Sequence, residues 1–232
     1  MKARKTSGMT MAELLVYCVV FSFCLTGVFG IFKAGKDSFE VGAVNVDLQG
    51  NALRAARQLG RELRESNWTS TQNFTTSPKG IIFVSPRNPS DNNSFDYNVT
   101  EKKIYWHKLV CYYIATNSAT GVKALFRKEV AINATSANSS ITALDAAHDT
   151  TTEFANDNTL KRKVISDYVD ETQSAITQET STKSYVVMLI LKKETRRLKK
   201  DVPRYHELIL DGKTQTGSSN NGLIRVTVRN QW

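Results

Sequence analysis

The sequence predicts an α+β fold in which one long N-terminal helix packs on an antiparallel β-sheet. An apolar segment at residues 9–32 is followed by an amphipathic helical pattern at 33–66, and short β-branched and aromatic segments recur after residue 67. The chain has 232 residues and a net charge of +9, which leaves enough length for one globular domain. Two of its three cysteines lie in the apolar segment, so no disulfide framework is expected.

The apolar segment is long enough to span a membrane. Residues 14–32 carry no charge, and the 24 residues from 9 to 32 would form a helix of about 36 Å, longer than a bilayer core of about 30 Å. Three basic residues precede it: Lys2, Arg4 and Lys5. The positive-inside rule then keeps the N-terminus in the cytoplasm and sends the following residues outward. The alternative is a secretory signal that is cleaved near residues 28–30.

The helical pattern continues beyond the apolar segment. Apolar residues then recur at steps of three or four: Val41, Val44, Leu48, Ala52, Ala55, Leu59 and Leu63. The pattern predicts one helix from Met9 to about Glu65, with an amphipathic second half. Four arginines on its other faces are expected to be solvated: Arg54, Arg57, Arg61 and Arg64.

The remaining residues predict several strands. The strand-like segments are 80–84, 103–113, 122–130, 164–169, 185–191, 205–210 and 223–228. The second and third are expected to form a hairpin, and residues 131–160 a loop with at most a short helix near 143–148. We expect an antiparallel meander whose apolar face is covered by the amphipathic half of the helix.

A carboxylate at the start of the apolar helix carries a resemblance to a known family. A basic leader, residues 1–8, ends in Gly8, and MTMAE follows, with Glu13 at the fifth position. This pattern resembles type IV prepilins and type II secretion pseudopilins. The resemblance implies that a prepilin peptidase cuts between Gly8 and Met9 and methylates the new Met9 amine. It also implies that Glu13 pairs with the Met9 amine of a neighbouring subunit. Alternatively, Glu13 only snorkels at the membrane edge.

The resemblance divides the chain into a leader 1–8, a membrane half 9–32, an amphipathic half 33–66 and a pilin-like globular domain 67–232. Three short segments resemble the larger minor subunits, namely J-type pseudopilins and W-type minor pilins: 125–127, 164–169 and 228–230. The implied function is a minor pilin or pseudopilin that helps initiate or cap a type IV pilus-like or type II secretion filament. The alternative is a membrane-tethered or secreted binding domain outside any filament.

The same resemblance implies a location and partners. The chain would cross the inner membrane once, with its globular domain outside, and then join a periplasmic or extracellular filament. Its partners would be the prepilin peptidase and other major and minor pilins or pseudopilins. The sequence shows no catalytic set and no cofactor or metal motif, so we expect no enzyme.

A basic stretch at residues 192–204 is the remaining signal. Its candidate anion-contact residues are Lys192, Lys193, Arg196, Arg197, Lys199 and Lys200. The simpler interpretation is a solvated loop between two strands. The functional alternative is contact with an anion, such as DNA phosphate, anionic lipid headgroups or an acidic face of the next subunit.

Overall fold

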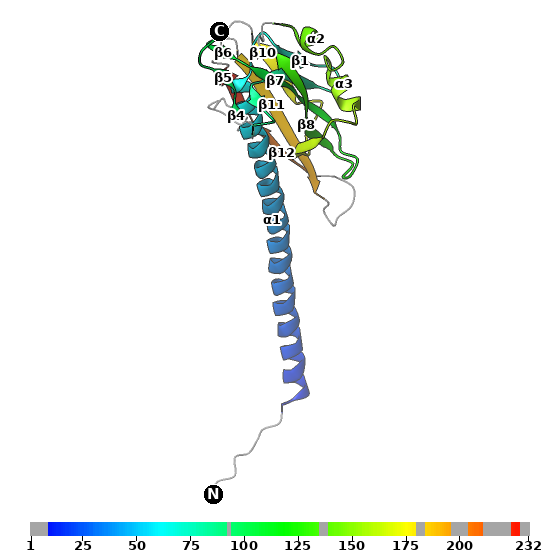
Figure 1. The fold of residues 1–232 in the computed structure, drawn as a ribbon. Helices are drawn as coiled ribbons and strands as arrows, with labels where there is room; N and C mark the ends of the chain where they lie inside the picture. Colours follow the sequence, from blue (N-terminus) through cyan, green and yellow to red (C-terminus); the bar gives the residue numbers. More distant parts are fainter. Residues whose placement is uncertain are drawn as a thin grey trace. The chain divides into compact units, whose positions relative to one another are not determined.

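The computed structural model describes residues 9–91, 94–134, 139–179, 184–195, 204–210 and 224–227 (Figure 1). These residues form one long N-terminal helix, short helices and antiparallel strands, which confirms the α+β class. The chain divides into two compact units, Met1–Val44 and Asn45–Trp232. The predicted leader lies outside the described residues.

Helix α1 spans Met11–Glu65, close to its predicted bounds. No proline interrupts its 55 residues, and it ends where the Ser66 hydroxyl donates to the Leu63 carbonyl at 2.7 Å. In the first unit its apolar side chains are exposed, with Met11 83% and Phe23 75% accessible. The helix is long and apolar enough to cross a membrane, although a signal sequence would share these properties.

The first sheet in the second unit is an antiparallel meander in the order β1-β2-β7-β8-β9. Its strands are β1 (Thr71–Phe74), β2 (Gly80–Ser85), β7 (Trp106–Thr116), β8 (Lys123–Ala134) and β9 (Lys163–Asp167). The predicted hairpin is confirmed: β7 pairs with β8, and the turn between them places Gly121 at a φ of +73°. Strand β1 was not predicted, because it has only four residues and its two central ones, Gln72 and Asn73, are polar and favour strands weakly.

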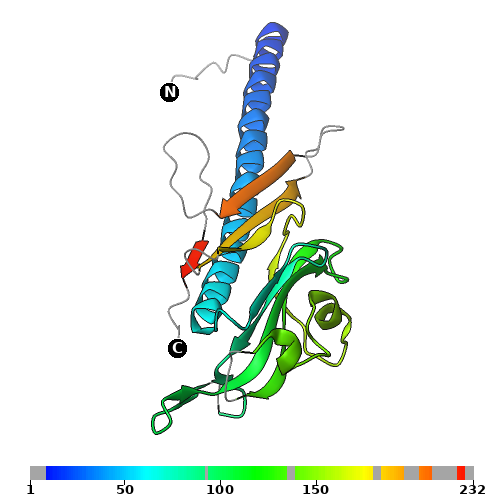
Figure 2. The same ribbon diagram turned by 90° about the horizontal axis from the view of Figure 1, so that it is seen from above.

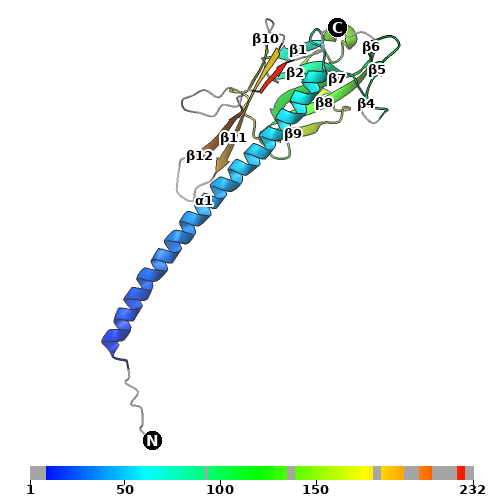
Figure 3. The ribbon, with the colours of Figure 1, turned by 90° about the vertical axis from the view of Figure 1, so that its left-hand side faces the viewer.

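The prediction of one continuous meander is wrong, because the C-terminal strands form a second sheet (Figure 3). Its strands are β10 (Ala175–Glu179), β11 (Ser184–Thr195), β12 (Arg204–Leu210) and β13 (Ile224–Thr227), and β11 pairs with the other three. After β9 the chain turns at Tyr168, which has a φ of +65°. The Asp170 amide then donates to the Ile190 carbonyl at 2.7 Å. The chain thus leaves the first sheet after β9 and contacts β11 of the second sheet.

Two small hairpins separate β2 from β7. The first pairs β3 (Arg87–Asn88) with β4 (Ser94–Phe95), and the second pairs β5 (Tyr97–Asn98) with β6 (Lys103–Ile104). The segment expected as one strand from residue 103 is therefore divided between β6 and β7. Its register shifts again between Trp106 and Lys108, where β7 pairs with β8.

Helix α1 covers one face of the first sheet, as expected. Its apolar stripe in the second unit is almost inaccessible: Leu48, Ala52, Ala55, Leu59 and Leu63 have at most 1% of their surface exposed. Glu62 lies next to these residues on the helix, and its Oε2 is 3.0 Å from Nε of Arg127 on β8. The amphipathic half of the helix is thus part of the core.

The opposite face of the sheet is covered by a segment that was expected to be mostly loop. It contains α2 (Ile141–Leu144) and α3 (Thr151–Asn156), which lie across β7 and β8 from α1 (Figure 2). Phe154 and Ile141 are buried against the sheet in one apolar cluster. Lys128 on β8 donates to the carbonyls of Phe154, Ala155 and Asp157 at 2.7, 3.2 and 2.7 Å. These contacts hold the segment on the sheet.

Candidate functional site

The N-terminal candidate site is formed by Met9, Thr10 and Glu13 at the start of α1. The Thr10 amide and hydroxyl donate to Oε2 of Glu13 at 2.9 and 3.0 Å, and the Glu13 amide donates to the Thr10 hydroxyl at 3.3 Å. The Leu14 amide donates to the Thr10 carbonyl at 3.1 Å, so Thr10 is the N-cap. Thr10 and Glu13 therefore form a capping box.

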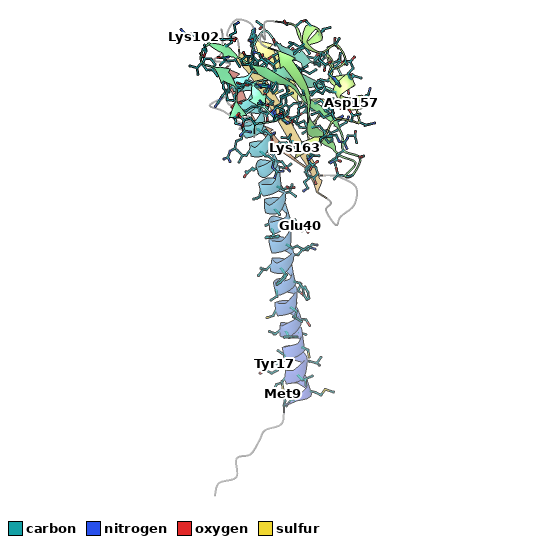
Figure 4. The ribbon with its side chains drawn as sticks, viewed as in Figure 1. Met9, Tyr17, Glu40, Lys102, Asp157 and Lys163 are labelled. Carbon is teal, nitrogen blue, oxygen red and sulfur yellow. The ribbon has the colours of Figure 1, made fainter. Side chains whose placement is uncertain are left out.

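The capping box gives Glu13 a role within its own chain. This role was missed in the sequence, although Thr-x-x-Glu before an apolar run is its usual signal. Oε1 of Glu13 has no hydrogen-bond partner among the described residues, so one carboxylate oxygen remains available to a second group. Met9 directly precedes this cap and is 55% exposed (Figure 4). The predicted cleavage partner Gly8 lies outside the described residues.

The basic stretch begins inside a strand rather than in a loop. Lys192 and Lys193 belong to β11, whereas Arg196, Arg197, Lys199 and Lys200 lie outside the described residues. Nζ of Lys193 is 2.6 Å from Oδ2 of Asp47 on α1 and 4.5 Å from the centre of the Tyr168 ring. The hydrogen bond to Asp47 raises the pKa of Lys193. Lys193 thus joins α1 to the second sheet, and the anion contact stays a prediction.

A charged groove lies beside the C-terminal half of α1. It has a volume of about 370 Å³. Its lining residues come from α1 (Gln58, Arg61, Glu62, Glu65), β2 (Ser85), β3 (Arg87), β7 (Lys108), β8 (Arg127, Glu129) and β9 (Lys163). Arg61, one of the four arginines expected to be solvated, is exposed and lines this groove. The groove was not predicted, because its residues are brought together only by the fold.

Ion pairs of three largely buried side chains, Glu62, Lys108 and Arg127, with one another or with the more exposed Glu129 form the inner wall of this charged groove. Nε of Arg127 is 3.0 Å from Oε2 of Glu62, and Nη2 of Arg127 is 2.8 Å from Oε2 of Glu129. Lys108 reaches the same Glu129 oxygen at 3.0 Å. Burial opposes the charge of Arg127, but Glu62, Tyr112 and Glu129 raise its pKa overall. Burial likewise opposes ionisation of Glu129, and Arg127 and Lys108 lower its pKa overall.

In the described part of the chain, no three His, Cys, Asp or Glu side chains come together as metal ligands. Asp170 accepts from the amide and hydroxyl of Thr172 at 2.9 and 2.6 Å. Glu171 pairs with Lys123 at 2.6 Å. These carboxylates are therefore used in local structure.

No family model, curated protein or solved structure matches this chain.

Proposed function

We propose that the chain is a minor pilin or type II secretion pseudopilin, which helps initiate or cap a filament. The observation that carries the proposal is the pattern of Gly8, Met9 and Glu13 at the start of a 55-residue helix. The first half of the helix is exposed and apolar, and the second half is buried against an antiparallel sheet. This combination is what a subunit needs to lie first in a membrane and then in a filament.

The exposed apolar half of α1 needs a cover, which lipid can supply before assembly and neighbouring helices after it. Glu13 would then be buried with the other apolar residues. A buried carboxylate without a partner is costly, whereas an opposite charge nearby offsets much of that cost. After cleavage behind Gly8, the Met9 amine of a neighbouring subunit supplies such a charge, and Oε1 of Glu13 is available to receive it.

This proposal implies the location and partners of the chain. It is inserted once in the inner membrane, with the N-terminus in the cytoplasm and the globular domain outside. It is cut and N-methylated at Met9 by a prepilin peptidase and then assembles with other major and minor pilins or pseudopilins. The J-type or W-type resemblance at residues 125–127, 164–169 and 228–230 favours a position among the larger minor subunits, and the last of these segments lies outside the described residues.

The capping box supports a second candidate function, a membrane-tethered binding domain that never enters a filament. In that case Glu13 serves only to start the helix. The two functions differ in whether the charge of Glu13 is needed.

Three variants separate the two roles of Glu13. Glu13→Gln keeps an oxygen that accepts from the Thr10 amide but removes the charge, whereas Thr10→Ala removes the cap hydroxyl and keeps the charge. We expect Glu13→Gln and Glu13→Ala to insert and to be cleaved but to be missing from sheared filaments, and Thr10→Ala to be incorporated. The measurement is recovery of the cleaved protein with filaments, or its crosslinking to companion subunits. Normal recovery of Glu13→Gln would favour the tethered domain.

A further inference from the structure

We propose that the charged groove beside α1 binds an oxyanion with about two negative charges, such as a phosphate group or a pair of carboxylates. The groove lies within the unit Asn45–Trp232. The inference therefore goes beyond the proposed function and does not depend on it.

The charges that line the groove do not balance. Its cations are Arg61, Arg87, Lys108, Arg127 and Lys163, and its carboxylates are Glu62, Glu65 and Glu129. Five cations against three carboxylates leave an excess of two positive charges. This net positive charge attracts anions into the groove.

The three carboxylates are already engaged by cations of the wall. Glu62 forms an ion pair with Arg127, and Glu129 forms ion pairs with both Arg127 and Lys108. Glu65 forms a bidentate ion pair with Arg87, whose Nε donates to Oε2 of Glu65 at 2.8 Å. These pairs connect α1 with β3, β7 and β8, so they fix the wall of the groove before any ligand arrives.

Arg61 and Lys163 provide the excess charge. Neither side chain has a hydrogen-bond or ion-pair partner among the described residues. On the helix, Glu65 lies four residues after Arg61, at a spacing that allows an ion pair, but Glu65 pairs with Arg87 instead. Lys163 reaches the groove from β9 and is labelled in Figure 4. Two unpaired cations from separate elements thus line one groove.

The size of the groove suits a small oxyanion. Its volume of about 370 Å³ is many times the roughly 10–15 Å³ that a single water molecule needs. This space accommodates a phosphate group with part of its hydration, or two carboxylate side chains of another chain. Arginine guanidinium and lysine ammonium groups both form charge-assisted hydrogen bonds with such oxygens.

Paired charge-removing variants test the proposal. The double variant Arg61→Gln/Lys163→Gln removes the two unpaired cations of the groove. Its matched control, Arg64→Gln/Lys161→Gln, removes the same charge from the same helix and from the segment just before β9, at exposed residues that do not line the groove. All four positions are exposed, so both variants should unfold at the same temperature as the native chain.

Binding is measured by isothermal titration calorimetry on the full chain in a non-ionic detergent at low salt, with inorganic phosphate and then succinate as probes. We expect one phosphate to bind per chain, with affinity reduced at least about tenfold in the groove variant and less than about twofold in the control. Succinate binding with the same dependence, without phosphate binding, also supports the proposal and indicates carboxylates as the natural ligand. Equal weakening in both variants, or no binding of either probe, would overturn it.

Discussion

At the scale of single residues, His148 is placed to respond to pH. Its Nδ1 is 2.8 Å from Oδ2 of Asp145, its Nε2 is 2.9 Å from Oδ2 of Asp157, and its ring packs against Phe154. A neutral imidazole can donate from only one nitrogen, so both hydrogen bonds are satisfied together only when His148 is protonated. The residue therefore joins the ends of α2 and α3 more strongly in its charged form.

The first prediction concerns stability against pH. Partial burial disfavours the charge on His148, but hydrogen bonds with Asp157 and Asp145 raise its pKa overall above 6.5. Its stabilising contribution should be fully present below about pH 6.5 and should be lost as the pH rises through the pKa of the folded state. Urea unfolding of the native chain and of His148→Gln should therefore differ by about 1–3 kcal/mol near pH 6.

The difference between the two proteins should shrink at pH 8.5 or above. In acid, the stabilisation by His148 should persist until Asp157 becomes protonated. Hydrogen bonds from Thr159 and His148 hold the pKa of Asp157 well below its usual range, so this loss occurs only at very low pH. A difference that stays constant from pH 6 to 9 would show that His148 contributes through packing against Phe154 alone.

At the scale of elements, the Glu62–Arg127 pair joins α1 to β8. Both side chains are largely buried, with 10% and 13% of their surface exposed. Arg127 also contacts Glu129, so its charge is shared between two carboxylates. Removing one partner of a buried pair leaves an uncompensated charge, which is far more costly than removing both.

The second prediction follows from that asymmetry. We expect Glu62→Leu and Arg127→Met each to destabilise the chain by about 3–5 kcal/mol in urea unfolding. The double variant should be clearly more stable than the less stable single variant, since Glu129 then still has Lys108 as a partner. Simple additivity of the two single effects would mean that the pair is not coupled in the folded chain.

The elements also show what could be predicted from the sequence. Helix α1 and strands β2, β7 and β8 were predicted because their apolar periods are long or their residues strongly favour strands. Helix α3 was missed, and α2 was expected only as a short helix near residues 143–148, because both depend on local caps, such as the Thr150–Glu153 capping box. That signal was present in the sequence but was outweighed by the Ser/Thr/Asn composition around it.

The two candidate sites also differ in whether the sequence alone could predict them. The pattern of Gly8, Met9 and Glu13 is continuous in the chain, so it could be recognised without a structure. The groove depends on Arg61, Lys108 and Lys163, which come from three elements, and no local pattern connects them. The separate second sheet was missed for a related reason, since the turn at Tyr168 has no glycine to mark it.

At the scale of the whole molecule, the second half of α1 belongs to the folded core. The buried residues Leu48, Leu59 and Leu63 each remove most of a large apolar side chain from water. At about 1.5–3 kcal/mol each, they contribute roughly 5–9 kcal/mol, which is comparable to the whole stability of a typical domain.

The third prediction is therefore a contrast between two truncations. A chain of residues 36–232 should be soluble and unfold cooperatively, because it retains the entire unit Asn45–Trp232. A chain of residues 67–232 lacks the helix stripe and should aggregate or show no cooperative transition by circular dichroism. A cooperative, monomeric 67–232 fragment would mean that α1 is not needed for the core.

The proposed function as a whole predicts one particular N-terminus for the mature chain. Intact-mass measurement and N-terminal fragmentation of the protein from its native membranes or filaments test this directly. We predict a chain that begins at a methylated Met9, and we predict that Gly8→Val leaves residues 1–8 attached, because the peptidase requires the small residue before the cut. A native chain that still begins at Met1, or one that begins near residue 31, would contradict the assignment to the prepilin family.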